Sequence, residues 1–185
     1  MKLNAGGILM NWSFYDLDYL MHITGWQLQP RVVLAKWWPV AEKMSDYVAA
    51  GSDADSHYIA FVLCEDDMVL SMERSEFSSA TAEQAWEIIG TEGTLHLPMQ
   101  PKAGEPNTVI LDRFLPGEGV VSEAIWEEGE ERRDRGASDD VLEDFARAVR
   151  EHRPPKTTLE KALVMQKITD AIYASAESGR SISIS

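Results

Sequence analysis

Two carboxylates flank a leucine near the start of the chain and form the first group that could do chemistry. Asp16 and Asp18 stand near the beginning of a segment with helical periodicity. Paired carboxylates can divide the roles of acid and base between them. The positive end of a helix also stabilises negative charge without any catalysis. On position alone we expect a plain capping role, unless a longer pattern includes these residues.

The other candidate ligands and nucleophiles are isolated from one another. The histidines at positions 22, 57, 96 and 152 never show the His-x-x-x-His spacing that places two metal ligands on one helical face, so no metal site is expected. His22 and His96 each sit within an apolar pattern, so no direct chemical role is expected of either. The single cysteine, Cys64, follows an apolar run and cannot form an internal disulfide, which predicts a buried structural thiol.

The sequence contains no glycine-rich phosphate loop. The nearest glycine pairs, Gly90 with Gly93 and Gly117 with Gly119, do not form a strand-to-helix cradle. A dinucleotide needs backbone donors at a helix N-terminus for its pyrophosphate. The chain is therefore expected to bind no nicotinamide cofactor by itself.

The first half of the chain predicts a helix, a strand and a hairpin. Residues 10–25 have apolar positions at helical spacing and end at Gly25. Residues 31–38 are rich in β-formers and are followed by a proline, which indicates a strand. Residues 57–63 and 68–77 are extended runs joined through an acidic turn, so an antiparallel hairpin is expected.

A second helix is predicted from Thr81 to Gly90. Thr81 and Gln84 have the spacing of a capping box, and Trp86, Ile88 and Ile89 contribute to an apolar stripe. Three more strands are then predicted, at residues 94–97, 108–114 and 120–126.

Two helices and a short tail complete the pattern. The first of these helices precedes Pro154-Pro155 and is expected to bury one face, formed by Val141, Leu142, Phe145, Ala146 and Val149. The second is predicted to begin with a capping box of Thr157 and Glu160 and to end at Gly179. Residues 181–184 have a β-like pattern.

Size, composition and element order indicate a soluble α+β protein. The chain has 185 residues, 44% of them hydrophobic, which suits one globular domain. Its formal charge of −14 would repel a phosphate backbone, so nucleic acid is not an expected partner. No apolar run approaches the roughly 20 residues that span a bilayer, and the start lacks the apolar core of a signal peptide. A cytoplasmic protein without a membrane partner is expected, with a largely antiparallel sheet and helices on one face.

Residues 6–18 carry a longer pattern, Gly-Gly-Ile-Leu-Met-Asn-Trp-Ser-Phe-Tyr-Asp-Leu-Asp. It resembles the segment Gly-Gly-x-Leu-x-Asp-x-Gly-x-His-x-x-Asp of the glucose-fructose oxidoreductase/inositol dehydrogenase (Gfo/Idh/MocA) family. Residues 90–95 are similar to the Gly-Thr-x-Gly turn of that family, and residues 140–184 to its C-terminal end. Together these stretches cover nearly the whole chain, and their order and spacing carry the resemblance.

The resemblance implies that residues 1–185 are a single domain, the substrate-binding and oligomer-forming C-terminal domain of such an enzyme. Its fold would be an open-faced sheet whose free face pairs with another subunit. The Rossmann domain that holds NAD(P) in the family would be missing, so NAD(P) would belong to the presumed full-length enzyme. A lysine from that domain would join the substrate site.

The family's catalytic positions correspond to Asn11, Tyr15 and Asp18. The family aspartate is replaced by Asn11, the family histidine by Tyr15, and the second aspartate is retained as Asp18. Some relatives also have tyrosine at the histidine position, so the resemblance implies a role for Tyr15 in proton transfer. A cation would have to lower its pKa from about 10. Packing of Tyr15 against the sheet is the alternative.

Two functions remain open at this point. The chain is either the substrate and oligomerisation domain of an NAD(P)-dependent oxidoreductase acting on a sugar, polyol or related hydroxy compound, or a non-enzymatic protein that self-associates or binds a small ligand. In both, the apolar residues of strand 57–63 predict a homo-oligomer through the sheet face. Charge at Phe61 or Val62 is expected to dissociate it.

Overall fold

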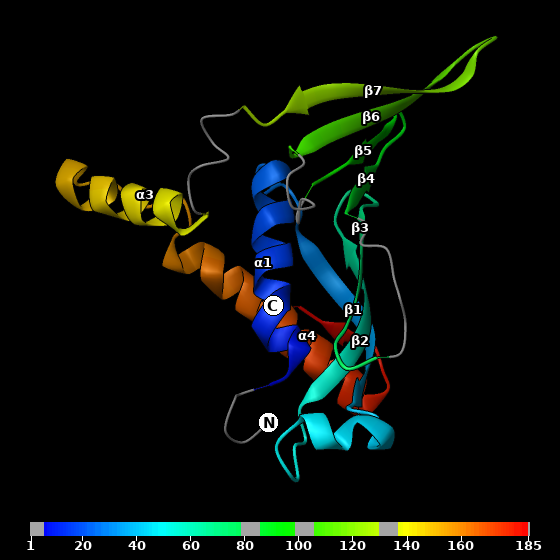
Figure 1. The fold of residues 1–185 in the computed structure, drawn as a ribbon, viewed down its shortest axis with the longest axis vertical. Helices are drawn as coiled ribbons and strands as arrows, with labels where there is room; N and C mark the ends of the chain where they lie inside the picture. The colour runs from blue at the N-terminus through cyan, green and yellow to red at the C-terminus, as the bar shows by residue number, and fades with distance from the viewer. Residues whose placement is uncertain (1–5, 79–85, 99–105, 130–136, 185) are drawn as a thin grey trace. The chain divides into compact units, whose positions relative to one another are not determined.

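The computed structural model describes residues 6–78, 86–98, 106–129 and 137–184, and the chain divides into two compact units. The first unit comprises residues 1–80 and 156–185, and the second comprises residues 81–155. Each unit contains one four-stranded sheet in which neighbouring strands are antiparallel (Figure 1). The α+β class with antiparallel sheets is confirmed, and the predicted strands divide between two sheets instead of one.

The first unit places two helices against one face of its sheet (Figure 1). Its elements are α1 (Ile8–Ile23), β1 (Pro30–Pro39), the 3-10 helix η1 (Glu42–Tyr47), β2 (Asp55–Cys64), β3 (Val69–Ser75), α4 (Leu159–Ser178) and β8 (Ile182–Ser183). The strand order is β3-β2-β1-β8, so the C-terminal tail pairs with β1 as predicted.

Alternation along the strands separates a covered face from an open one. The core contains Val33 and Ala35 of β1, Tyr58, Ala60 and Val62 of β2, and Leu70 and Met72 of β3, together with apolar residues of α1 and α4. Phe61 points to the other face and is 49% exposed, whereas Val62 is fully buried. A charge at Val62 would therefore disrupt the core, so Phe61 is the one of these two positions at which a charge can test self-association.

Helix α1 begins two residues earlier than predicted, so its two carboxylates lie further from the helix N-terminus than expected. Because the helix starts at Ile8, Asp16 and Asp18 lie beyond its second turn, and its first turn contains no acidic residue. The capping role expected for them is wrong. Gly25 follows the helix with φ of +63°, in the left-handed region that glycine adopts readily.

The second unit contains β4 (Glu87–Ile89), β5 (Thr94–His96), β6 (Thr108–Leu115), β7 (Gly119–Glu127) and α3 (Ala137–Glu151), with strand order β4-β5-β6-β7. The helix predicted from Thr81 to Gly90 is wrong at its C-terminal end, because Glu87–Ile89 is a strand; residues 81–85 lie outside the described residues. Ile88 pairs with Leu95 through the turn at residues 90–93, and this pairing overrides the helical spacing of the apolar side chains.

Both predicted C-terminal helices form, with two corrections. The apolar face of α3 is not buried: Val141, Leu142, Phe145 and Val149 are each at least 60% exposed, and Ala146 is exposed. Periodicity identifies an apolar face but not the surface that covers it. The N-cap of α4 is Thr158 and not Thr157, since Thr158 Oγ1 accepts from the Lys161 main-chain N–H at 3.4 Å. Gly179 ends the helix with φ of 66°, as predicted.

Among the described residues, no helix has the length and apolar character needed to cross a membrane.

Candidate functional site

One face of α1 brings the predicted site residues together. Asn11, Tyr15, Asp18 and His22 are separated by four, three and four residues, so they fall on a single stripe of a helix with 3.6 residues per turn. Asn11 is exposed, Tyr15 is 62% exposed, and Asp18 and His22 are partly exposed. The stripe is thus open to a ligand, and each of the three sequence-predicted site residues lies on it.

The position of α1 is fixed by a buried carboxylate at its N-terminus. Asp55 of β2 is 2% exposed and accepts the main-chain N–H groups of Gly7 at 2.7 Å and Leu9 at 2.8 Å. Tyr173 of α4 donates its hydroxyl to the same carboxylate at 2.7 Å, and burial raises the pKa of this phenol so that it keeps its proton. Free helix N–H groups and a negative charge stabilise each other at this end of a helix.

Glycine is required where α1 meets β2. A Cβ on Gly7 would lie 1.9 Å from the main-chain oxygen of Asp55, far inside van der Waals contact. The glycine therefore permits the close approach through which Asp55 reaches the first turn. A second link lies one turn further on, where the buried Ser13 hydroxyl donates to Tyr58 of β2.

Asp18 is held between its own helix and the segment that leads into α4. Thr157 donates its hydroxyl to Asp18 Oδ1 at 3.1 Å, and Asp18 Oδ1 lies 3.5 Å from His22 Nε2. His22 Nε2 is also 3.0 Å from Thr157 Oγ1. His22 therefore belongs to a polar cluster, and its ring also packs edge-on against Trp26, with the ring centroids 5.4 Å apart.

Beside the stripe, two side chains hold Trp12 in place: Arg74 of β3 and Glu76, which follows β3. The indole N–H donates to Glu76 Oε1 at 2.8 Å, and the Arg74 guanidinium carbon lies 4.9 Å from the Trp12 ring centroid. Arg74 Nη1 lies 2.8 Å from both carboxylate oxygens of the buried Asp16. Asp16 thus anchors Arg74, and Arg74 supports Trp12 by a cation–π contact.

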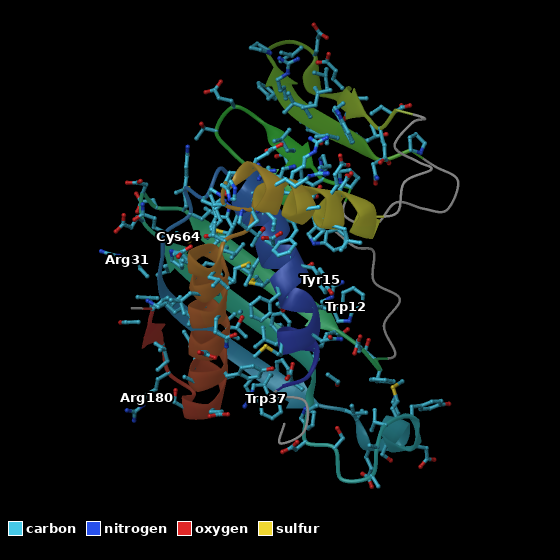
Figure 2. All side chains as sticks on the ribbon, turned by 90° about the vertical axis from the view of Figure 1, so that its left-hand side faces the viewer. Trp12, Tyr15, Arg31, Trp37, Cys64 and Arg180 are labelled. Atoms are coloured by element: carbon cyan, nitrogen blue, oxygen red, sulfur yellow. The ribbon has the colours of Figure 1, made fainter. Side chains whose placement is uncertain are left out.

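Tyr15 lies next to Trp12 on the exposed surface. Their ring centroids are 5.8 Å apart with an interplanar angle of 54°. Figure 2 shows both side chains on the same side of α1. Tyr15 therefore does not pack against the sheet, which was the alternative to a chemical role, and its hydroxyl is accessible.

The described residues do not fit a dinucleotide cofactor. The N–H groups of Gly7 and Leu9 at the start of α1 already donate to Asp55, and Thr158 caps the start of α4. The strand pairings of the described residues are all antiparallel, so these residues contain no parallel β-α-β unit to hold a pyrophosphate. The structure also brings no group of three metal-ligating side chains together within the described ranges.

Comparison with protein-family models identifies the fold. The model of the oxidoreductase family Gfo/Idh/MocA, C-terminal α/β domain, matches residues 1–184. The chain belongs to this family. Comparison with curated proteins gives no significant match.

Solved structures similar to the chain include three oxidoreductases with low sequence identity. An oxidoreductase domain protein from Kribbella flavida has a TM-score of 0.72 and 14% identity, over 97% of this chain and 50% of that one. The myo-inositol 2-dehydrogenase from Lactobacillus plantarum has a TM-score of 0.68 and 19% identity, over 100% and 50%. A UDP-N-acetylglucosamine 3-dehydrogenase from Acidithiobacillus ferrooxidans has a TM-score of 0.65 and 20% identity, over 92% and 49%. The chain thus spans about half the length of these structures, and the similarity establishes the fold.

The Gfo/Idh/MocA resemblance located the stripe on α1 but not the residues that support it. Neither Asp55 nor Arg74 was among the site residues predicted from the sequence. Asp55 lies 48 residues from Gly7, and Arg74 lies 58 residues from Asp16. No local pattern links residues at such separations, so only the packed fold reveals these contacts.

His96 and Cys64 lie away from the stripe. His96 lies between two carboxylates of the second unit, with Nδ1 3.1 Å from Glu87 Oε1 and Nε2 2.8 Å from Asp112 Oδ2. Cys64 is half-buried, and burial raises the pKa of its thiol, which suits an unreactive cysteine.

Proposed function

We propose that this chain is the substrate-binding and oligomer-forming domain of an NAD(P)-dependent oxidoreductase acting on a sugar, polyol or related hydroxy compound. The observation that carries the proposal is the accessible stripe of Asn11, Tyr15 and Asp18 on α1. The sequence resemblance implies that these are the positions of the family's catalytic residues. The similarity to a myo-inositol 2-dehydrogenase and a sugar-nucleotide dehydrogenase supports the substrate class.

Within this proposal each residue of the stripe has a distinct role. Oxidation of a secondary alcohol releases the hydroxyl proton, and Tyr15 is the group that takes it, acting as a phenolate that is paired with a cation from outside the described residues. Asn11 orients a substrate hydroxyl through its amide but cannot accept the proton as a base. Asp18 shapes the far end of the stripe, where Thr157 and His22 hold its carboxylate.

NAD(P) would supply the acceptor for the hydride in the whole enzyme. Because the described residues do not fit a dinucleotide, the cofactor would be held by another domain. The contribution of this chain is then to bind and orient the alcohol and to hold the proton at the Tyr15 hydroxyl.

The open face of the first sheet supports the second part of the proposal, self-association. Leu34 and Phe61 are directly paired across β1 and β2 and are 54% and 49% exposed. Ile59, Leu63 and Val69 extend the apolar face, each more than 40% exposed. An exposed apolar patch of this kind on a sheet marks a protein interface, and a second copy of this chain is the proposed cover.

Ligand binding by the isolated chain tests the proposed function. We expect wild-type protein to bind myo-inositol or glucose in a calorimetric titration. Tyr15→Phe should weaken this binding by roughly 2- to 10-fold, because one hydrogen bond contributes about 0.5–1.5 kcal/mol.

The matched control is Tyr47→Phe, since Tyr47 is 75% exposed on η1 and away from the stripe. It should bind as wild type does. Absence of binding to every neutral sugar and polyol tested would contradict the proposed function.

A further inference from the structure

Trp12 is a partly buried aromatic residue that packs against the core of the first unit and is held in one orientation by polar side chains. Its indole N–H is fixed by Glu76 at 2.8 Å, and one face is covered by the Arg74 guanidinium at 4.9 Å. Arg74 is itself fixed by the buried Asp16 at 2.8 Å. The side chains of Glu76, Arg74 and Asp16 thus hold the Trp12 ring in one orientation before any ligand binds.

The ring of Trp12 and the ring of Tyr15 are neighbours, tilted by 54° relative to each other. The two residues are three positions apart on α1, and their centroids are 5.8 Å apart (Figure 2). The negative face of an aromatic ring attracts positively polarised C–H bonds. The face of a saturated ring that carries its axial C–H bonds fits such a surface.

Polar groups border the aromatic surface on the stripe side. Asn11 lies one helical turn before Tyr15, which places their Cβ atoms about 5–6 Å apart. That span is similar to the width of a six-membered ring, so an amide and a phenol can bond hydroxyls at the edge of a ring that stacks on Trp12. The aromatic ring of Trp12 and the polar groups of Asn11 and Tyr15 together favour binding of a cyclic compound with several hydroxyls over an open-chain one.

The charges around this surface favour a neutral ligand. Asp18 and Glu76 present carboxylates at its margins. The nearby cations are already engaged, Arg74 with Asp16 and His22 with Asp18 and Thr157. The net charge of −14 adds a long-range repulsion of anions.

We infer that Trp12 is a specificity-determining residue, and that its fixed indole, beside Tyr15, binds the C–H face of a neutral six-membered cyclic polyol or sugar in preference to an acidic one. This inference rests on the proposed function, because it names the ligand of the same site. It assigns Arg74, Asp16 and Glu76 to the positioning of the ring.

The test compares glucose with glucuronate, which differ only in the carboxylate, in calorimetric titrations of the whole chain. Wild type should bind glucose at least about tenfold more tightly than glucuronate at low ionic strength, a difference of 1.4 kcal/mol, and added salt should reduce the difference. Trp12→Leu should weaken glucose binding at least about tenfold, whereas Trp12→Phe, which keeps an aromatic ring, should stay within about threefold. Tyr47→Leu is the matched control and should not change binding.

Glu76→Gln tests the charge of Glu76 without a substitution in the core. Its readout is the preference for glucose over glucuronate, which would not change if Glu76 had only a structural role. The amide can still accept from the indole, so glucose binding should persist, but loss of the charge should weaken the discrimination against glucuronate. Equal binding of glucose by Trp12→Leu and wild type would overturn the inference while leaving the proposed function in place. Equal affinity of wild type for glucose and glucuronate would do the same, and failure of wild type to bind any neutral ring would overturn both.

Discussion

Replacement of Asp55 should loosen the helix that carries the candidate site. The carboxylate accepts hydrogen bonds from Gly7 N, Leu9 N and the Tyr173 hydroxyl at 2.7–2.8 Å, and it is 2% exposed. Asp55→Ala would remove all three acceptor contacts. Tyr173 is half-exposed and can turn toward water, but the two main-chain donors are fixed by the helix.

The magnitude follows from those two donors. A buried donor left without a partner costs about 1–3 kcal/mol, so Asp55→Ala should lower the free energy of unfolding by about 4 kcal/mol, including the lost attraction to the helix dipole. Asp55→Asn keeps one acceptor oxygen and should cost about 2 kcal/mol. Gly7→Ala forces the same contact apart from the other side and should also destabilise the chain, since its Cβ would lie 1.9 Å from Asp55 O.

Urea unfolding followed by circular dichroism measures these differences as shifts of the midpoint at constant slope. Hydrogen exchange of the α1 amides reports whether the loss is local to that helix. Asp46→Ala is the matched control, because Asp46 is an exposed carboxylate on η1. A loss of less than about 0.5 kcal/mol for Asp55→Ala, the range of neutral surface changes, would refute the reasoning.

Three further predictions concern the rest of the chain. Hydrogen bonding to Asp112, together with the charges of Asp112 and Glu87, raises the pKa of His96. Its contribution to the second sheet is therefore present below about pH 6.5 and is lost as the pH rises through the raised value. The protection of the β5 amides, corrected for the base-catalysed exchange of an unfolded chain, should fall from pH 6 to pH 9, and His96→Gln should remove this fall. Gly93→Ala should destabilise the second sheet, because its Cβ would lie 2.5 Å from the Asp112 main-chain oxygen, whereas Gly129→Ala, with open space around it, should have little effect on thermal unfolding. Phe61→Lys should convert the oligomer to a monomer in sedimentation velocity without loss of helical circular dichroism; a wild-type chain that sediments only as a 20.7 kDa species would refute the proposed interface.

Local patterns predicted most elements of the first unit correctly. The hairpin of β2 and β3 was recognisable because two alternating runs flank an acidic turn, in which Asp66 and Asp67 adopt positive φ. Gly179 could be assigned as the end of α4 because a left-handed C-cap favours glycine. These features depend on residues that are adjacent in sequence.

The errors arose where a partner element, and not the pattern of the segment itself, decides the structure. Ile88 and Ile89 fit a helical stripe, but cross-strand pairing with β5 makes them a strand. The apolar face of α3 was predicted correctly, but its burial was not, because the face is exposed. Periodicity identifies an apolar face and does not say which other element covers it.

The same distinction holds for the site. Asn11, Tyr15 and Asp18 could be placed on one helix face from their spacing and from the family resemblance. The contacts of Asp55, Arg74 and Glu76 that hold α1 and Trp12 in place could not be predicted. Each of these residues lies 46 or more residues from its hydrogen-bond partner.

The most direct test of the central claim, that the stripe on α1 is the substrate site, is an NMR titration of nitrogen-15-labelled protein with myo-inositol. We expect saturable shift changes concentrated in the amides of residues 11–18 and in the indole N–H of Trp12, which donates to Glu76. Shift changes confined to other elements, or none up to the solubility of the ligand, would contradict it.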